Sequence, residues 1–293
     1  MTSIRPRRSV LYMPGSKERA LQKGKELATD AIIFDLEDAV APDMKEVARQ
    51  QVQSAVSEGG YDNRELVIRV NGINTSWFED DLKAAASANP DAILVPKVSN
   101  EKDVALVREK LESLGANGII DLWAMMETPL AMLKALEIAQ SGPSEKYRLR
   151  AFVMGTNDLA KETGAVLKPG REPMLAWLST CVAAGRAFEI DIIDGVYNDF
   201  KDEEGFVKEC QQGADLGMDG KTLIHPGQLG PCNETFSPTK ESVEWAQKII
   251  SAFELPENQD KGAITVEGKM VELLHAEMAK RTVAIAKAIE QSA

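Results

Sequence analysis

The sequence predicts a TIM barrel, an α/β fold in which eight parallel strands alternate with helices. Eight short apolar runs recur along the 293 residues and begin 22 to 40 residues apart. The stretches between them mostly show the apolar periodicity of amphipathic helices, so each repeat is about one strand and one helix. The predicted strands are Arg8–Met13, Asp30–Leu36, Glu65–Val70, Asp91–Val95, Ile119–Met126, Arg150–Met154, Ile190–Ile193 and Lys221–Ile224.

Polar, carboxylate-bearing or glycine-containing segments follow most of these runs. The C-terminal ends of barrel strands meet at one rim and carry the chemistry, so we expect these segments to line a common site. In chain order the strand ends are Pro14-Gly15-Ser16-Lys17, Asp35-Leu36-Glu37-Asp38, Arg69-Val70-Asn71, Pro96-Lys97, Glu127-Thr128-Pro129, Gly155-Thr156-Asn157-Asp158, Asp194-Gly195 and His225-Pro226.

The chain continues well beyond the eighth predicted strand. A Gly/Pro-rich stretch, 226–231, leads into a predicted helix over about 239–253, which would complete a catalytic barrel domain of residues 1–254. Residues 263–269 predict a small hairpin and residues 270–289 another helix. We therefore expect residues 255–293 to form a C-terminal lid extension that caps the barrel or docks on a neighbouring subunit.

The charge balance argues against nucleic acid or an anionic membrane as the main partner. The net charge is −12, whereas neutralising phosphates requires a basic face. One local exception could hold a phosphorylated cofactor, because its basic residues are accompanied only by Glu18. This N-terminal basic cluster consists of Arg5, Arg7, Arg8, Lys17, Arg19, Lys23 and Lys25.

Cysteine usage and the N-terminus predict a cytoplasmic protein with no membrane partner. Cys181, Cys210 and Cys232 stand far apart without a CxxC pair, which fits packing residues in a reducing compartment. The chain contains no run of 18 apolar residues, and its N-terminus enters the first strand without a signal-peptide core.

Several reaction chemistries do not match the sequence. With only two histidines and no HExxH motif, a multi-histidine zinc site is excluded. Gly220-Lys221-Thr222 imitates a P-loop, but Asp215 stands where the first glycine of that motif belongs, and the chain has no GxSxG elbow. Acidic residues at strand ends remain, and oxygen ligands of this kind suit Mg²⁺.

Six segments, in order, resemble the citrate lyase β-subunit-like (CitE-like) branch of the HpcH/HpaI aldolase superfamily. The resemblance runs from Arg8 to about residue 290 and includes similarity to malyl-CoA and citramalyl-CoA lyases. The segments that carry it are Arg8–Ser16, Asp30–Pro42, Val67–Asn71, Glu127–Pro129, Asn157–Ala160 and Gly220–Pro226.

The resemblance implies a Mg²⁺-dependent carbon–carbon lyase that forms a homotrimer or a hexamer. Its expected substrate is a 3-hydroxyacyl-CoA thioester of the malyl-CoA or citramalyl-CoA type, cleaved reversibly through an enolate. The expected products are acetyl-CoA and a 2-oxoacid, glyoxylate or pyruvate. Three alternatives remain: a citrate lyase β subunit that takes its thioester from an acyl carrier protein, a malyl-CoA thioesterase, and a non-catalytic member of the fold.

The resemblance also implies that Glu127 and Asp158 bind Mg²⁺ and, with Asn157, the 3-hydroxyacid half of the substrate. A Lewis acid there would polarise the oxygen next to the breaking bond. The alternative is that Glu127 and Asp158 are N-terminal caps of the helices that follow strands five and six.

Arg69 ends an otherwise apolar strand, so we expect its guanidinium in the barrel mouth, where it can bind a carboxylate or the developing thioester enolate. The alternative is a structural ion pair with Asp35 or Glu37, and the two interpretations are compatible because a carboxylate neighbour would orient the arginine. We include Asp35 and Glu37 in the catalytic group on that basis. Lys97 could serve a Schiff-base aldolase, but a surface or supporting role is favoured.

Tyr12, Lys17 and Lys23 match positions that contact the CoA nucleotide in the resembling malyl-CoA lyases. Lysines suit the phosphates and a tyrosine ring suits adenine, whereas the alternative is a solvated helix face. In the tail, Glu272 stands where relatives usually carry the aspartate of a lid that reaches a neighbouring subunit's active site. We expect Glu272 to handle a proton there, and the alternative is an exposed carboxylate at a helix start.

Overall fold

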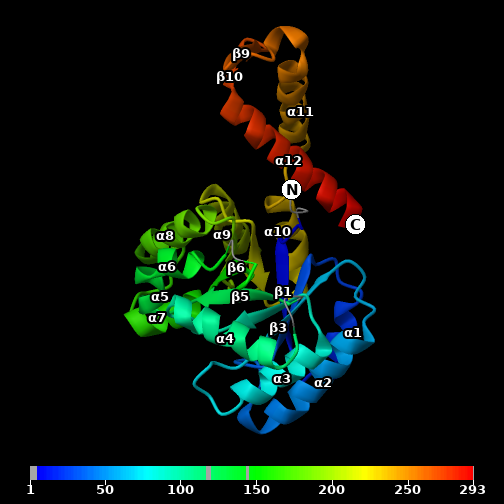
Figure 1. Cartoon of the computed structure of the whole chain (residues 1–293), viewed down its shortest axis with the longest axis vertical. Helices are drawn as coiled ribbons and strands as arrows, with labels where there is room; N and C mark the ends of the chain where they lie inside the picture. The colour runs from blue at the N-terminus through cyan, green and yellow to red at the C-terminus, as the bar shows by residue number, and fades with distance from the viewer. Residues whose placement is uncertain (1–4, 117–119, 143–144, 293) are drawn as a thin grey trace. The chain divides into compact units, whose positions relative to one another are not determined.

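The chain folds into a closed eight-stranded parallel barrel with helices between the strands, followed by a C-terminal helical hairpin (Figure 1). This computed structural model describes residues 5–116, 120–142 and 145–292. All eight predicted strands are present in sequence order, and the TIM barrel prediction is confirmed. The strands are β1 (Ser9–Pro14), β2 (Ala31–Asp35), β3 (Glu65–Arg69), β4 (Ala92–Val95), β5 (Asp121–Met126), β6 (Leu149–Met154), β7 (Asp191–Asp194) and β8 (Gly220–Leu223).

Helices follow each strand and cover the outside of the barrel, with one or two short helices in several of the loops. The predicted fifth strand began at Ile119, which lies outside the described residues. The barrel-unit helices are α1 (Glu18–Gly24), α2 (Lys45–Glu58), α3 (Phe78–Ala88), α4 (Glu101–Ser113), α5 (Pro129–Leu133), α6 (Ala135–Ala139), α7 (Thr156–Thr163), α8 (Leu175–Arg186), α9 (Glu203–Asp215) and α10 (Leu229–Thr235), with 3₁₀ turns at Pro42–Met44, Glu172–Met174 and Pro226–Gln228.

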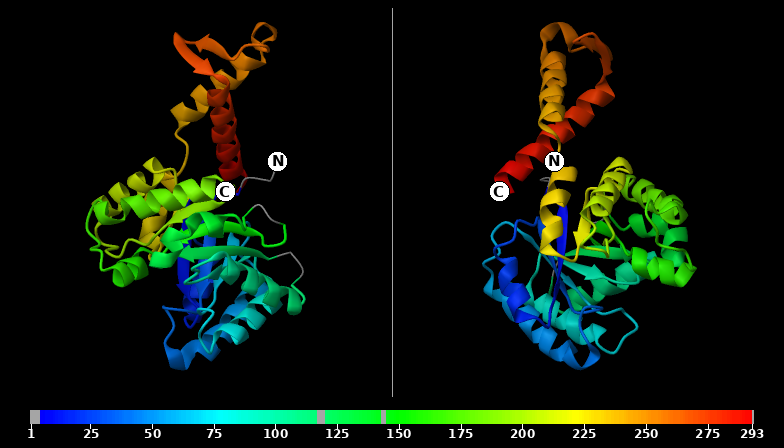
Figure 2. Two further views of the ribbon diagram at one scale, coloured as in Figure 1. Left: turned by 60° about the vertical axis from the view of Figure 1, so that its left-hand side comes forward. Right: turned by 180° about the vertical axis from the view of Figure 1, so that it is seen from behind.

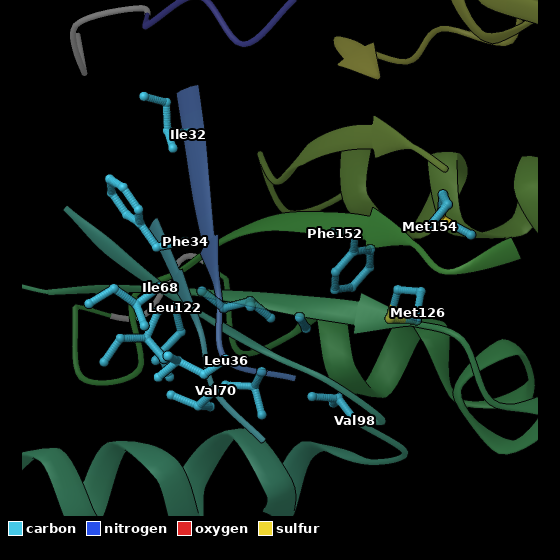
Figure 3. Close-up of a cluster of buried hydrophobic side chains, with 14 of the residues drawn as sticks. Ile32, Phe34, Leu36, Ile68, Val70, Val98, Leu122, Met126, Phe152 and Met154 are labelled. Carbon is cyan, nitrogen blue, oxygen red and sulfur yellow. The ribbon is translucent and has the colours of Figure 1, made fainter. Parts of the chain in front are cut away.

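Side chains alternate along each strand between the barrel interior and the layer under the helices. Val10, Ile33 and Trp123 belong to the interior cluster, whereas Phe34 and Phe152 belong to the outer one (Figure 3). Both faces of a barrel strand are buried, so the strands read as continuous apolar runs. A polar residue within such a run is therefore conspicuous, and most of those found here lie at the strand ends.

Arg7 closes the N-terminal end of the barrel. Its Nε lies 2.7 Å from Glu65 Oε2, its Nη1 contacts Asp191, and its guanidinium lies 5.1 Å from the centre of the Trp123 ring. Arg8 in turn forms an ion pair with Asp30, with Nη2 2.7 Å from Oδ1. These two arginines are therefore used inside the fold and cannot serve the N-terminal basic cluster as cofactor-binding groups.

The chain from Ser237 onward forms a separate compact unit, while Arg7–Phe236 forms the barrel unit. In this C-terminal unit, α11 (Lys240–Glu254) and α12 (Leu273–Ser292) are joined through the β9 (Ala263–Val266) and β10 (Lys269–Glu272) hairpin (Figure 2), after a 3₁₀ turn at Pro256–Asn258. The boundary suggested by contacts thus lies before α11 and not after residue 254. The reason is that Ala246 and Ile249 of α11 pack in a core shared with the hairpin and α12.

The predicted hairpin is present, but the predicted last helix begins later than expected. Glu267 and Gly268 have φ angles of 48° and 78°, which is the two-residue turn geometry that joins antiparallel strands. Met270 pairs with Thr265 in this hairpin, so residues 270–272 are strand and α12 starts at Leu273. None of the helices in the described part of the chain combines the length and apolar character needed to cross a bilayer.

Candidate active site

Arg69 and Asp35 form the centre of a polar group at the C-terminal rim of the barrel. The two residues are directly opposite each other in the β2–β3 register. Arg69 Nε donates to Asp35 Oδ1 and Nη2 donates to Oδ2, each over 2.7 Å. Both side chains are buried, with Arg69 6% exposed and Asp35 fully covered. The paired geometry fixes the plane of the guanidinium.

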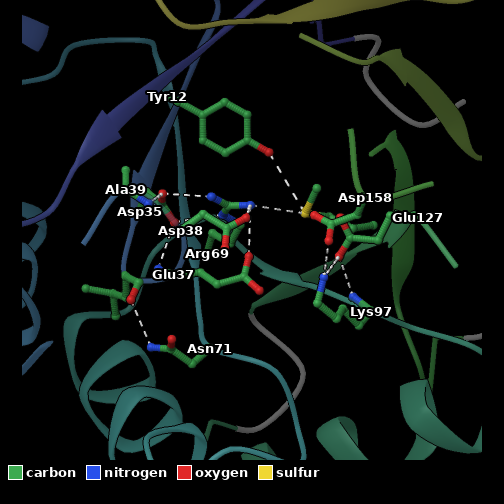
Figure 4. Close-up of polar contacts among 12 residues, drawn as sticks. Tyr12, Asp35, Glu37, Asp38, Ala39, Arg69, Asn71, Lys97, Glu127 and Asp158 are labelled. Carbon is green, nitrogen blue, oxygen red and sulfur yellow. Dashed lines mark hydrogen bonds and ion pairs between the residues drawn. The ribbon is translucent and has the colours of Figure 1, made fainter. Parts of the chain in front are cut away.

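Asp35 is held in its ionised form by more than the arginine. Burial alone would raise the pKa of Asp35, but Arg69 and the backbone N–H groups of Glu37 and Ala39 lower it below its usual value. Those two N–H groups donate to the Asp35 oxygens over 2.9 Å each. The carboxylate therefore both orients Arg69 and shapes the loop after β2 (Figure 4).

Glu37 behaves in the opposite way although it touches the same arginine. Its Oε2 lies 2.9 Å from Arg69 Nη1, yet burial raises the pKa of Glu37 to about 8, with Arg69 only partly opposing the shift. Asp35 takes up two of the arginine's N–H bonds, so less of its charge is available to Glu37. Burial thus favours the protonated form of Glu37, whereas the contacts of Asp35 favour its ionised form.

A buried lysine, Lys45, donates hydrogen bonds to the loop after β2. Lys45, the first residue of α2, donates to the carbonyl oxygens of Leu36 and Glu37 over 2.8 Å and 2.7 Å, and to Asn71 Oδ1 over 2.7 Å. Asn71 also donates to the Leu36 carbonyl over 2.8 Å. Sequence reasoning missed Lys45, because a lysine at a helix start usually faces solvent.

Glu127 and Asp158 converge on one cation despite lying 31 residues apart in the chain. Lys97 Nζ lies 2.8 Å from Asp158 Oδ1 and 3.9 Å from Glu127 Oε1. The Lys97 backbone N–H also donates to Glu127 Oε1 over 2.7 Å. Glu127 is 1% exposed. Burial raises its pKa to about 7, with Lys97 opposing and Asp158 adding to the shift.

Neither Glu127 nor Asp158 is the N-cap of its helix, although Asp158 lies in the first turn of α7. Thr128, not Glu127, caps α5, where its side chain accepts the Ala131 N–H over 3.0 Å. The N-cap of α7 is Gly155, and a Cβ at Gly155 would lie 2.4 Å from Glu127 Cβ and Oε2. Because Gly155 has no side chain, the Glu127 side chain can occupy the space beside it.

The geometry fits a hard divalent cation that takes oxygen ligands. Glu127 and Asp158 present carboxylate oxygens on two sides of a space large enough for an ammonium group. Within the described residues, no cluster of three or more His, Cys, Asp and Glu side chains forms a metal site. A pair of carboxylates such as Glu127 and Asp158 suits Mg²⁺, because Mg²⁺ binds through one or two carboxylates and completes its shell with water and substrate oxygens.

Tyr12 lies in the barrel mouth and not beside the predicted nucleotide-binding lysines. Its ring centre is 4.8 Å from Arg69 Cζ, and its hydroxyl lies 4.0 Å from Met125 Sδ. Lys17 and Lys23 are exposed, at the start and in the last turn of α1. Tyr12 therefore packs on Arg69, whereas Lys17 and Lys23 are exposed to solvent.

Three further predicted positions have other neighbours within their own units. Asn157 forms a reciprocal amide pair with Asn198, over 3.1 Å and 2.8 Å, next to Asp158 at the rim. Asp194 faces outward from β7 into a buried ion cluster with Arg171 and Lys221, at 2.7 Å and 2.8 Å. Glu272 is in the C-terminal unit at the end of β10.

Comparisons with known proteins identify the family of the chain. The HpcH/HpaI aldolase/citrate lyase family profile matches residues 8–226. A (3S)-malyl-CoA thioesterase of Cereibacter sphaeroides is 51% identical, over 97% of this chain and 96% of its own. The mitochondrial citramalyl-CoA lyase of Mus musculus is 31% identical, over 98% and 88%.

Among solved structures, CitE of Mycobacterium tuberculosis, in complex with magnesium, acetoacetate and coenzyme A, superposes with a TM-score of 0.75. Its sequence is 26% identical to this one, and the match covers 94% of this chain and 97% of that chain. The sequence, the barrel and the rim residues therefore lead to one conclusion: the chain belongs to the HpcH/HpaI aldolase/citrate lyase family.

Proposed function

We propose that this chain is a Mg²⁺-dependent enzyme of 3-hydroxyacyl-CoA thioesters of the malyl-CoA type, and that it hydrolyses the thioester. The observation that carries the proposal is the placement of Arg69 beside the Glu127–Asp158 pair at one barrel rim (Figure 4). Hydrolysis takes precedence over cleavage because the 51% identical relative is named a thioesterase.

Glu127 and Asp158 would hold the metal. When bound, Mg²⁺ supplies a Lewis acid that orients and polarises the oxygens of the hydroxyacid half of the substrate. Glu127 reaches this position from the end of β5, and Asp158 from the first turn of α7. Glu127 directly follows β5, and α7, which carries Asp158, begins two residues after β6, so the spacing of the two carboxylates is set by the barrel.

Arg69 would bind the thioester oxygen. In hydrolysis, water loses a proton as its oxygen adds to the thioester carbonyl carbon, and the π electrons move to the carbonyl oxygen. The carbonyl then re-forms as the C–S bond breaks, and the sulfur takes up a proton to leave as the CoA thiol. A guanidinium N–H stabilises the oxygen on which the negative charge develops. Asp35 uses Nε and one N–H of Nη2, and Nη1 contacts Glu37 Oε2 and Met125 Sδ, so the second N–H of Nη2 is the donor proposed for this task.

Glu37 and Glu272 are the proposed proton carriers. With a pKa of about 8, Glu37 is protonated at neutral pH and can donate a hydrogen bond or a proton in the barrel mouth. Glu272 would act from the lid of a neighbouring subunit in a homotrimer or hexamer. Lys17 and Lys23 would meet the CoA phosphates as point charges.

Carbon–carbon cleavage is the second candidate, and the citramalyl-CoA lyase relative supports it. In that reaction the substrate hydroxyl loses its proton, the C–C bond breaks, and the electron pair moves into a thioester enolate whose oxygen again faces Arg69. The products are a 2-oxoacid and acetyl-CoA. A non-catalytic role is disfavoured because Arg69, Glu127 and Asp158 are all present and converge.

The deciding experiment is to incubate the purified protein with (3S)-malyl-CoA and Mg²⁺ and to identify the products by mass spectrometry. Malate with free CoA thiol is the expected result, whereas glyoxylate with acetyl-CoA would show cleavage. Chelator should stop the reaction. Unchanged malyl-CoA after prolonged incubation, with Mg²⁺ bound and the protein folded, would overturn the proposal, and citramalyl-CoA and citryl thioesters then become the substrates to examine.

A further inference from the structure

Lys97 makes three contacts with the two carboxylates at the proposed metal site. Its Nζ lies 2.8 Å from Asp158 Oδ1 and 3.9 Å from Glu127 Oε1, and its backbone N–H donates to Glu127 Oε1 over 2.7 Å. The backbone at Lys97 has a φ of 55°, in the left-handed region that few residues other than glycine adopt. The turn after β4 thus directs both the amide and the ammonium of one residue toward the pair.

We propose that the Lys97 ammonium is a resident cation, which holds Glu127 and Asp158 together in the metal-free protein and must leave for Mg²⁺ to bind. This inference rests on the proposed function. Mg²⁺ bound to a carboxylate lies about 2.0–2.1 Å from the oxygen. An ammonium 2.8 Å from the same oxygen occupies the adjoining space, and two cations there would repel each other.

The side chain of Lys97 is able to leave. It is 42% exposed, whereas Glu127 is 1% exposed and held by its strand. Only the Nζ contacts need to break, because the backbone N–H bond to Glu127 belongs to the turn and can persist. The exchange therefore moves one flexible side chain toward solvent and leaves the ligand geometry in place.

This role differs from that of a Schiff-base lysine. An amine that attacks a carbonyl must be deprotonated, and an ammonium paired with two carboxylates is stabilised in its charged form. Lys97 would act by competing with Mg²⁺ and thereby setting the metal affinity, not by bonding to the substrate. It would also keep the two carboxylates from repelling each other before the metal arrives.

The test compares Mg²⁺ binding to the wild type and to Lys97→Met by isothermal titration calorimetry. We expect the variant to bind Mg²⁺ up to about fivefold more tightly, the range that loss of one part-exposed ion pair produces. In the absence of Mg²⁺, Lys97→Met should have a lower melting temperature than the wild type and a larger rise when Mg²⁺ is added.

The matched control is Lys110→Met. Lys110 has a similar exposure, 31%, and forms an ion pair with Glu79, but it is in the last turn of α4, at the end of the helix remote from the catalytic rim. Its removal should leave Mg²⁺ affinity unchanged. In addition, acylation of the Lys97 amine, followed by peptide mass spectrometry, should be faster with Mg²⁺ than without.

The outcomes separate this inference from the proposed function. Equal or weaker Mg²⁺ binding by a folded Lys97→Met variant, with acylation insensitive to Mg²⁺, would overturn the resident-cation role alone. Wild-type protein that binds no Mg²⁺ would overturn both proposals. If Lys97→Met binds Mg²⁺ more tightly but malyl-CoA is not turned over, the inference is supported and only the proposed substrate fails.

Discussion

Arg69 and Asp35 lie opposite each other on adjacent strands and share two hydrogen bonds of 2.7 Å. The pair is almost completely buried, so removing either partner would leave an uncompensated charge. The ion pair expected from the sequence is therefore present, and it is compatible with the proposed catalytic role because Asp35 fixes the plane of the guanidinium.

Arg69→Lys should reduce turnover on the order of 10²-fold or more, because a lysine cannot bind both Asp35 oxygens and present a planar donor at once. The measurement is kcat per folded molecule, with circular dichroism to establish the folded fraction. Arg148→Lys is the matched control: Arg148 pairs with Asp121, with Nη2 2.7 Å from Oδ1, at the opposite end of the barrel. If both variants lost only thermal stability, Arg69 would be structural.

Glu127→Gln and Asp158→Asn should each abolish Mg²⁺-dependent turnover and weaken Mg²⁺ binding measured by calorimetry, because each removes one of only two proposed carboxylate ligands. The fold should survive, since a glutamine at position 127 can still accept the Lys97 N–H. Asp121→Asn, which changes a carboxylate at the other barrel end, should bind Mg²⁺ like the wild type. Undiminished binding by either site variant would place the metal elsewhere.

The stability of the metal-free protein should depend on Glu37 in a defined pH range. Burial raises the pKa of Glu37 to about 8 from 4.5. Its protonated form is thus favoured in the folded state, and its contribution to stability is complete below about pH 4.5 and lost as the pH rises toward 8. Asp35, whose pKa is lowered, acts in the opposite sense and loses its contribution as the pH falls.

Melting temperatures of the wild type and Glu37→Gln between pH 5 and 9, measured in chelator, provide the test. The wild type should lose stability across this range relative to the variant, because glutamine cannot ionise. Glu112→Gln, at an exposed position on α4, should follow the wild type. Parallel curves for the wild type and Glu37→Gln would mean that Glu37 does not carry its proton in the folded protein.

The barrel was predictable because its strands are buried on both faces and thus read as short apolar runs. The rim was predictable for the same reason, since ionisable residues such as Arg69 and Glu127 stand out where the runs end. Asp194 obeyed the same pattern but faces outward, toward Arg171 and Lys221. Strand-end position alone does not say to which side a side chain points, and this depends on the register within the barrel.

The remaining differences have physical causes that short motifs do not record. Tyr12 packs on Arg69, with the guanidinium carbon 4.8 Å from the ring centre, a neighbour that the short motif around Tyr12 does not record. Lys97 contacts Asp158, 61 residues away in the sequence. The contact depends on a left-handed backbone conformation at Lys97, which the dipeptide Pro96-Lys97 does not predict. The unit to which α11 belongs depends on which element its apolar face contacts. That contact is with the hairpin and α12, and the sequence of α11 alone does not specify it.

Gly155→Ala should weaken Mg²⁺ binding although position 155 has no ligand atom. The added Cβ would lie 2.4 Å from Glu127 Cβ and Oε2, so the Glu127 side chain must shift. Displacing a ligand through its support typically costs roughly 10- to 100-fold in metal affinity, which calorimetry would detect. Gly230→Ala on α10 meets no atom within 4 Å and should be silent. Equal affinities for the two variants would show that Glu127 tolerates the crowding.

The last prediction concerns Glu272, proposed to serve a neighbouring subunit's active site. It ends β10, and its backbone N–H donates to His275 Nδ1 over 2.9 Å, which joins the hairpin to the first turn of α12. Glu272→Ala keeps this backbone bond, so the lid should remain folded while losing its carboxylate. We expect low turnover from the Glu272→Ala oligomer and from the Arg69→Ala oligomer, each of which lacks one component in every site.

Mixing the two variants under conditions that exchange subunits should restore part of the activity, because a site formed by Arg69 of one subunit and Glu272 of another is intact. If subunits assort at random, about a quarter of the sites in an equal mixture regain both residues, which sets the level to look for once native mass spectrometry has verified exchange. Glu272→Gln is the companion variant, since it preserves size and hydrogen bonding but cannot accept a proton. Full activity in the unmixed Glu272→Ala oligomer would remove any catalytic role for Glu272, whereas verified exchange without recovery would confine its action to its own subunit.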